Sequence, residues 1–574
     1  MKILKFTPLA FGVGMFFSSG LIAQTDSDTL KMDVTFVGER EMVVKDALKL
    51  QSWPEPRSLD NTNRDFTYRL LSKRLNVSPQ WTLIEPVRLK VDAPLSRLYR
   101  GYITAGYGLH NTPLLNLSLT DLRSREGTWG IKASHFATNS PVVDVEDRYQ
   151  ESQGGVWASR FIGKEKVDLS LNVNRNNIVY YGRSFENPIE NDSVRSERYL
   201  TIGSDIAFKS HYRDSTKLNH EVNFGWGMLS DLSGTLENNF EGDFTIGKFV
   251  ETEKYTLTGS INFDRLTIGE QNPNNQSTDQ VILGIEPMVT TYKGPLTVTV
   301  GAGIWVDADP ESRNDGQNFY FYPKVDASIR LLKDIFVPYL RIGGGLEQNR
   351  FESVLQKNPF FYVNVDEHLK TTSRKADIQL GLRGTITNAM SFQVHARTVK
   401  YDNYIYFYND SSMDGGSRFS ILYDTLGINT FGGDLSFVLS KSLRAQLSGS
   451  VHKYSKQLED ENNEAWNLPK YQASIDIDYS FLEKFSIKLS TQFVGERYGM
   501  TGIPPQEDQS PLLNGNYKVN LPSYIDANIG LEYRYTSRTA VWMNLNNITG
   551  SQYKHWDAYP NQGFQALFGA SYLF

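Results

Sequence analysis

Cysteine is absent from this chain of 574 residues. Its absence excludes a disulfide framework, a lipid anchor on cysteine, a thiolate metal site and thiol catalysis. An excess of one charge is also missing, because the formal net charge at pH 7 is only -6. Nothing in the sequence forms the concentrated basic face that nucleic-acid binding requires. We therefore expect no nucleic-acid partner.

The sequence motifs of common enzymes are missing as well. The eight histidines are scattered, and none forms an HExxH motif or a pair at ligand spacing with a carboxylate. The chain contains no GxSxG elbow and no P-loop. Ser134 and His135 are adjacent in an expected strand, so they point to opposite faces, which argues against a catalytic dyad. We expect no metal site, no cofactor and no enzymatic activity.

Long hydrophobic runs are missing beyond the start of the chain. Lys2 and Lys5 accompany an apolar run over residues 6–17, and residues 21–23 (Leu-Ile-Ala) form a small-residue cleavage region. The run is too short to cross a membrane as a helix. We therefore expect an export signal peptide over residues 1–23, cleaved near Ala23. A retained helical anchor is the alternative.

The chain is rich in aromatic residues and glycine, and its apolar and polar residues alternate. It contains 31 tyrosines, 32 phenylalanines and 45 glycines, which suit the aromatic girdles and tight turns of a membrane barrel. From about residue 98 onward apolar and polar residues alternate, as over residues 255–263, 471–481 and 485–493. Such alternation, sustained for most of a chain, favours a closed wall between lipid and water. The mean hydropathy of -0.41 fits, because the two faces average to a hydrophilic value.

The connections between the expected strands alternate in length. Short links occur at residues 163–165, 293–295, 332–334, 441–442 and 536–538. Long polar segments occur at residues 139–155, 182–196, 267–279, 307–318, 348–370, 410–417, 456–467, 496–521 and 549–563. We therefore predict an all-β fold over residues 98–574. It is a transmembrane antiparallel β-barrel of about 22 strands, counted to within two, with short periplasmic turns and long extracellular loops.

The chain ends in an aromatic residue on an alternating strand. Phe568, Tyr572 and Phe574 fall on one side of this strand. Outer-membrane barrels present such a terminal strand to the machinery that inserts them. We expect these three residues to form a C-terminal insertion signal, with that machinery and outer-membrane lipid as partners.

The last fifty residues resemble TonB-dependent receptors. The matching residues are 521–524 (Leu-Pro-Ser-Tyr), 531–535 (Leu-Glu-Tyr-Arg-Tyr), 542–548 (Trp-Met-Asn-Leu-Asn-Asn-Ile), Tyr553, Gly563 and 570–574 (Ala-Ser-Tyr-Leu-Phe). The resemblance covers the barrel and agrees with the expected strand number. It implies an outer-membrane protein of a Gram-negative bacterium. Receptors of this family also carry a plug domain of more than about a hundred residues before the barrel.

Residues 24–97 are too few for such a plug, so we expect a short periplasmic or lumenal N-terminal segment instead. Residues 33–40 (Asp-Val-Thr-Phe-Val-Gly-Glu-Arg) loosely resemble the stretch that contacts the energising protein in that family, and an ordinary strand is the alternative. A barrel of this size encloses a lumen that something must fill. The N-terminal segment, infolded loops such as residues 348–370 and 496–521, or a separate protein could do so.

Charged residues on the polar face of the expected strands should line this lumen. They are Lys324, Asp326, Arg330, Asp476, Asp478, Asp526, Glu532 and Arg534. A solvated, mutually paired wall is one interpretation, and a surface for selectivity or plug docking is the other. The same choice applies to the acidic segment 457–466, which is either a solvated loop or a site for a cation or partner.

Two functions fit these predictions. The first is solute uptake across the outer membrane by a receptor-like barrel. The second is a plugless barrel that acts as a structural subunit of a larger outer-membrane assembly or secretion complex, with other outer-membrane or surface proteins as partners. The fold resemblance favours transport, although fold alone is a weak argument for function.

Overall fold

The computed structural model describes residues 98–574 with internal gaps. The gaps are residues 123, 125, 143–144, 183–195, 211–215, 270–276, 309–317, 333–334, 364–367, 388, 414–415, 441, 457–463, 483, 504–511 and 513–515. The expected signal peptide and the N-terminal segment 24–97 lie outside the described residues, and so does most of the acidic segment 457–466.

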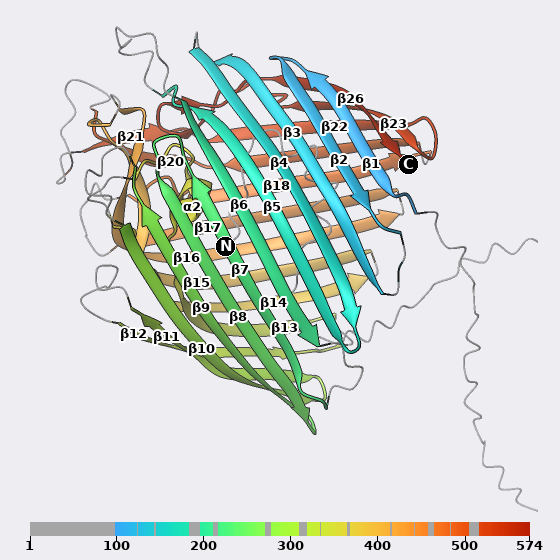
Figure 1. The fold of residues 1–574 in the computed structure, drawn as a ribbon, viewed down its shortest axis with the longest axis vertical. Helices are drawn as coiled ribbons and strands as arrows, with labels where there is room; N and C mark the ends of the chain where they lie inside the picture. The colour runs from blue at the N-terminus through green and yellow to red at the C-terminus, as the bar shows by residue number, and fades with distance from the viewer. Residues whose placement is uncertain are drawn as a thin grey trace, which may run out of the picture. The chain divides into compact units, whose positions relative to one another are not determined.

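The described chain is built almost entirely from strands that follow one another along the sequence (Figure 1). The first half contains β1 (Gly101–Gly108), β2 (Thr112–Thr120), β3 (Gly127–Val142), β4 (Val145–Ile162), β5 (Glu165–Val179), β6 (Ser196–Ser210), β7 (Asn219–Ser230), β8 (Leu236–Val250), β9 (Glu253–Thr267), β10 (Ser277–Lys293), β11 (Leu296–Asp307), β12 (Phe319–Ile329) and β13 (Val337–Glu347). The second half contains α2 (Phe351–Lys357), β14 (Thr372–Thr387), β15 (Met390–Asn409), β16 (Phe419–Ser440), β17 (Leu443–Lys456), β18 (Tyr471–Phe481), β19 (Phe485–Val494), β20 (Arg497–Thr501), β21 (Tyr517–Leu521), β22 (Tyr524–Arg534), β23 (Thr539–Asn546), β24 (Lys554–Trp556), β25 (Tyr559–Pro560) and β26 (Gln565–Leu573).

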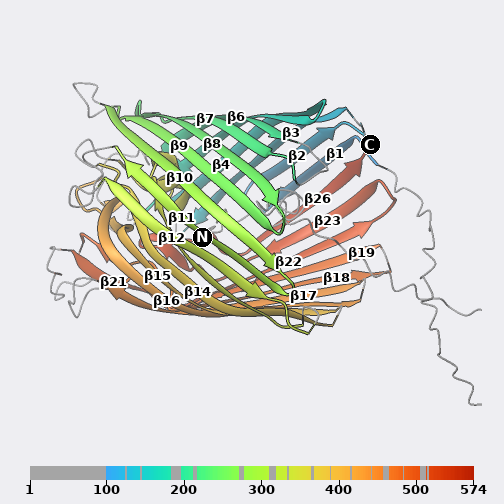
Figure 2. The same ribbon diagram turned by 90° about the horizontal axis from the view of Figure 1, so that it is seen from below.

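The strands close into one antiparallel ring (Figure 2). The main sheet has 24 strands, of which β20 and β21 form a side hairpin that meets β15 where Met500 pairs with Tyr408. The other 22 strands form the wall, and β1 closes it against β26 with Tyr102 opposite Leu573. The predicted all-β barrel of about 22 strands is therefore confirmed.

The two ends of the barrel differ in how the chain turns. At one end, which we call the turn end, short connections include Gly163 (φ 64°) and Gly294 (φ 59°), and Phe574 lies beside Gly101. Glycine tolerates this left-handed conformation because it lacks a Cβ. At the opposite end, which we call the loop end, the connections are longer. They carry α2 and the β20–β21 and β24–β25 hairpins.

The wall is apolar outside because alternate residues of each strand face outward. Leu380 of β14 and Phe431 of β16 are 61% and 64% exposed, whereas Tyr322 of β12, on the inner face, is 2% exposed. Contact with hydrocarbon stabilises exposed apolar side chains on an outer face. Within the described residues no helix is both long and apolar enough to cross a membrane.

The β3–β4 hairpin differs from the sequence prediction. Residues 139–155 were expected to be a long loop, but β3 continues to Val142 and β4 begins at Val145. Strands that extend beyond a membrane have water on both faces, so their sequence loses the alternation that marks a spanning strand. Because these residues are polar and do not alternate, the sequence predicted a loop where the structure has a regular hairpin.

Candidate functional site: the cap and the lumen wall

A buried hydrophobic cluster at the loop end joins residues from many parts of the chain. We call it the cap; its main side chains are Ile178, Tyr180, Tyr181, Tyr199, Leu229, Leu266, Ile268, Phe351, Val354, Leu355, Phe361, Val363, Leu369, Ile405, Phe407, Phe419, Ile421, Trp556 and Tyr559. Phe361 and Val354 are fully buried. Loop side chains would not be buried to this extent unless the loops packed against one another.

The cap connects opposite sides of the ring. The ring centres of Tyr181, just after β5, and Tyr559, in β25, are 4.9 Å apart. Tyr559 lies 6.0 Å from Phe419, the first residue of β16. In a ring of 22 consecutive strands, β5 and β16 lie half a circumference apart. A chain of aromatic contacts therefore crosses the barrel mouth from wall to wall.

Arg418 strengthens this crossing. Its guanidinium carbon lies 4.6 Å from the ring centre of Tyr180 and 4.6 Å from that of Tyr362. Cation–π contacts are stronger when they are desolvated, and Arg418 is only 4% exposed. Beside it, the rings of Phe360 and Tyr559 stack with centres 3.6 Å apart. Three segments are thus packed together: the residues that follow β5, those that precede β16, and the connection between β13 and β14.

The short helix α2 is fastened to β8. The buried carboxylate of Glu237 accepts the backbone N–H groups of Phe351 and Glu352, the latter at 2.9 Å. Arg350 forms an ion pair with Glu241, also on β8. The first N–H groups of a helix have no partner within the helix, so Glu237 both satisfies two of them and fixes the position of α2.

Further hydrogen bonds hold the rest of this connection in place. Asn349 donates from Nδ2 to the carbonyl of Lys370 and to the hydroxyl of Thr372, both at 2.7 Å. The hydroxyl of Thr371 donates to Asp307, at the end of β11, at 2.7 Å. The connection between β13 and β14 is therefore closed at its base and attached to the neighbouring wall.

The β20–β21 hairpin is attached to the β24–β25 hairpin through Arg497. Its guanidinium donates to the backbone carbonyls of His555 at 3.1 Å and Lys554 at 2.7 Å. Burial and then the positive charge of Arg497 lower the pKa of His555 to about 3. His555 is consequently neutral at physiological pH, and its ring makes a T-shaped contact with Trp556 of the cap at 5.5 Å.

Below the cap, the charges predicted to line the lumen pair between and along strands. Asp326 accepts from Arg341 at 3.0 Å, and Lys324 lies 2.5 Å from Glu286. Asp476 accepts from Ser490 on the adjoining strand β19 at 2.7 Å, and Asp526 accepts from Tyr553, which precedes β24, at 3.2 Å. Arg330 follows the last residue of β12 and is exposed. Their role in the lumen remains a prediction.

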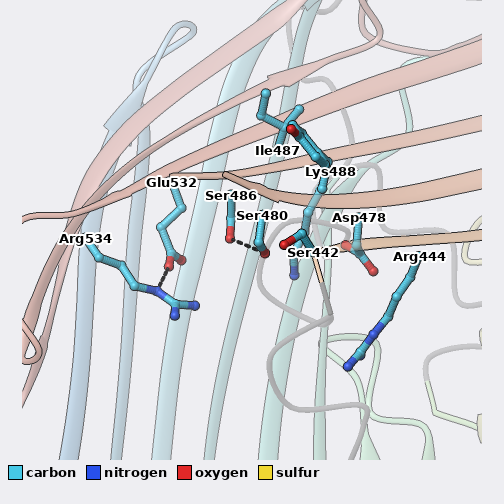
Figure 3. A pocket seen from close by; sticks show the side chains of 10 residues that line it. Ser442, Arg444, Asp478, Ser480, Ser486, Ile487, Lys488, Glu532 and Arg534 are labelled. Atoms are coloured by element: carbon cyan, nitrogen blue, oxygen red, sulfur yellow. Dashed lines mark hydrogen bonds and ion pairs between the residues drawn. The ribbon is translucent and has the colours of Figure 1, made fainter. Parts of the chain in front are cut away.

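A charged hollow of about 250 Å³ lies at the turn end on β17, β18, β19 and β22 (Figure 3). Asp478 lies in register between Arg444 and Lys488 on the neighbouring strands. Glu532 accepts from Nε of Arg534 at 2.8 Å. The hollow thus brings together three of the predicted residues, Asp478, Glu532 and Arg534, with two cations that the prediction did not name.

The three residues of the predicted insertion signal lie on the outer face around β26. Phe568, Tyr572 and Phe574 are 55%, 42% and 46% exposed. Gly101 of β1 leaves room for the ring of Phe574, because a Cβ there would lie 2.2 Å from a ring atom. The backbone N–H groups of Arg100 and Gly101 donate to the carbonyl of Phe574 at 2.7 and 2.9 Å. The signal function of these residues remains a prediction.

Sequence reasoning suggested infolded loops but missed the residues that form the cap. The only available signal was the density of aromatics in polar connections, such as Phe360, Phe361 and Tyr362. Most of their partners lie in other elements, as Tyr559 does for Phe360 and Phe407 for Phe361, so local patterns could not identify them. In the part of the chain that the structure describes, no cluster of three or more His, Asp or Glu side chains is arranged to hold a metal ion.

Comparison with solved structures shows which fold this architecture represents. The FrpB iron transporter from Neisseria meningitidis superposes with a TM-score of 0.64 at 9% identity, over 84% of this chain and 82% of that one. The copper transporter OprC gives a TM-score of 0.62 at 11% identity, over 83% and 80%. The siderophore receptor PirA from Pseudomonas aeruginosa gives 0.57 at 13% identity, over 83% and 81%.

The fold is that of the large outer-membrane receptor barrels. More particularly, the wall of 22 strands is that of the TonB-dependent receptors, which confirms the resemblance seen in the C-terminal sequence. No protein-family model matches the chain, and no curated protein sequence does. The structural neighbours are transporters and receptors, and at these identities the likeness concerns the fold.

Proposed function

We propose that this protein is exported, is inserted into the outer membrane of a Gram-negative bacterium and takes up a solute there. The observation that carries the proposal is the cap, which crosses from one side of the ring to the other above a polar wall. A barrel that acts only as a structural subunit would need no such closure, whereas a transport barrel must stay closed until its solute arrives. Iron, siderophores and copper are associated with the neighbours, so uptake of a scarce nutrient fits the same fold.

In this proposal each part of the molecule has a role. The signal peptide ends near Ala23, and the residues Phe568, Tyr572 and Phe574 direct insertion. The polar wall guides the solute once the cap opens. That wall comprises Lys324, Asp326, Arg330, Asp476, Asp478, Asp526, Glu532 and Arg534. Alternating charges suit a hydrated path, since polar lumen residues keep water in the barrel.

Conductance in planar bilayers tests the proposal. We expect the wild-type barrel to give small or infrequent currents, and a variant with residues 350–362 replaced by a short Gly-Ser linker to give large, steady ones. Phe481→Ala is the control, because this exposed aromatic lies at the turn end and its loss should leave the current unchanged. All three proteins must show the heat-resistant electrophoretic mobility of a folded barrel.

A silent variant would contradict the role given to the cap, because something else would then close the lumen. If proteins also co-purified with the silent barrel, the alternative of a structural subunit in a larger assembly would be favoured.

A further inference from the structure

Two hollows lie one above the other on the outer wall of β14–β17. The upper one, of about 800 Å³, is polar and is lined by Lys375, Thr398, Lys400, Asp402, Asn403, Asn429 and Ser455, among others. The lower one, of about 490 Å³, is apolar and includes Phe392, Val394, Leu435 and Leu447. We propose that together they bind one lipid of the leaflet at the loop end, whose headgroup is a phosphorylated sugar.

Strand register shows that both hollows lie on the outward face. Thr398 pairs with Ile378, which is 44% exposed, and with Asn429, which in turn pairs with Lys453. Two residues further along each strand toward the turn end, the aligned row is Leu380, Ala396, Phe431 and Val451, of which the three large side chains are 61%, 64% and 58% exposed. The polar hollow therefore begins where the apolar surface stops.

The upper hollow offers the groups that a phosphorylated sugar requires. Lys375 is paired with Asp402, and Asp424, which also lines the hollow, accepts the backbone N–H of Thr425 at 2.7 Å. Among the described residues, no ion pair is formed by Lys400, which lines the hollow, or by Lys453, which lies beside the hollow opposite Asn429. Lysine binds phosphate well. The hydroxyl of Thr398, which donates to the amide oxygen of Asn429 at 2.8 Å, and the amide of Asn429 are groups suited to a sugar.

Glycine creates the space in both hollows. Above, a Cβ on Gly427 would lie 2.3 Å from the hydroxyl of Ser455. Below, Gly433 and Gly449 pair across β16 and β17, between the exposed side chains of Phe431 and Leu435. Gly433 is four residues from Asn429, which is about 13 Å along a strand. That separation matches an acyl chain running from a headgroup into the hydrocarbon.

This arrangement favours an amphiphile over a protein partner. A single hollow could suit many ligands, but a polar hollow that contains Lys400, aligned above an apolar one on the same strands, suits a molecule with a charged head and an apolar tail. Lysines near a membrane surface attract anionic headgroups while their stems lie along apolar surface. The inference rests on the proposed membrane placement but not on solute uptake.

Native mass spectrometry of the whole protein in detergent tests the inference. The probes are lipid A, a phosphorylated diglucosamine lipid, and its dephosphorylated form. We expect the wild type to retain lipid A in preference, and the double variant Lys400→Ala/Lys453→Ala to bind it roughly ten-fold more weakly with the preference lost. The matched control is Lys164→Ala/Lys484→Ala at the turn end, which should behave as the wild type.

A second variant probes the lower hollow. Gly449→Leu should weaken both lipid forms equally, because a Cβ there has only the carbonyl of Gln472 nearby, at 3.9 Å, and its side chain would occupy the hollow. Equal binding of the two lipids by the wild type, or unchanged binding after the lysine substitutions, would overturn the inference. Bilayer conductance of the same variants separates this result from the fate of the transport proposal.

Discussion

At the residue scale, His555 couples the cap to pH. Its ring packs against Trp556, and burial lowers its pKa from the ordinary value of 6.5 to about 3. When this region is unfolded, His555 binds a proton below about pH 6.5, whereas in the folded protein it stays neutral down to about pH 3. The stability that neutral His555 contributes is therefore complete above pH 6.5 and is lost progressively as the pH falls toward 3.

We expect hydrogen-exchange protection of residues 553–561 to fall roughly ten-fold or more between pH 7 and pH 4, after correction for intrinsic exchange rates. In a His555→Gln variant the same peptide should show little pH dependence. Equal pH dependence in the two proteins would mean that another group controls the acid response.

Phe574 is the second residue with a testable consequence. It lies on the outer face and covers Gly101 across the seam between β1 and β26. A carboxylate here would face lipid or its interface, where charge is costly, and would lose the contact with Gly101. Phe574→Asp should therefore reduce the heat-resistant, membrane-inserted fraction several-fold.

The matched control is Tyr535→Asp, an exposed aromatic beyond the end of β22 at the same end of the barrel. It adds the same charge without touching the seam, so its insertion should equal that of the wild type. Normal insertion of Phe574→Asp would reject the interpretation of the terminal residues as a signal.

At the scale of elements, α2 depends on a carboxylate of another element. Glutamine in place of Glu237 can accept one of the two helix N–H groups, but its amide group would turn a donor toward the other. Leaving a buried donor without a partner costs about 1–3 kcal/mol. Glu237→Gln should therefore reduce exchange protection over residues 350–361 by about ten-fold or more.

Glu253→Gln serves as the control for this change. Glu253 begins β9 at the turn end, where it accepts from Tyr255, so its substitution should leave protection of α2 intact. Full protection of α2 in Glu237→Gln would show that the cap side chains alone hold the helix.

The elements also show what local sequence can predict. Spanning strands such as β18 and β19 were predictable, because lipid on one face and water on the other impose strict alternation. Where strands leave the membrane, as in β3 and β4, both faces are wet and the pattern fades. The β20–β21 and β24–β25 hairpins were not predicted, because contacts between residues distant in the chain hold them in place. One such contact joins Arg497 to the carbonyl of Lys554.

At the scale of the whole molecule, the number of strands and the closure of the ring followed from alternation and connection length. The cap did not, because it depends on pairs such as Tyr181 with Tyr559 and Tyr559 with Phe419 that only the closed ring brings together. Parity along a strand predicts which positions face the lumen, and for the eight charged residues this stays a prediction. Which of them share one hollow, as Asp478 and Glu532 do, depends on the register of several strands.

The cap also has a mechanical consequence. A hollow cylinder under sideways pressure from its surroundings tends to flatten into an oval, and a strut across its diameter resists that deformation. Tyr181, Tyr559 and Phe419 form such a strut between opposite walls. Any event that releases it lets the cylinder flex, so the opening of the barrel mouth and the stiffness of the tube change together.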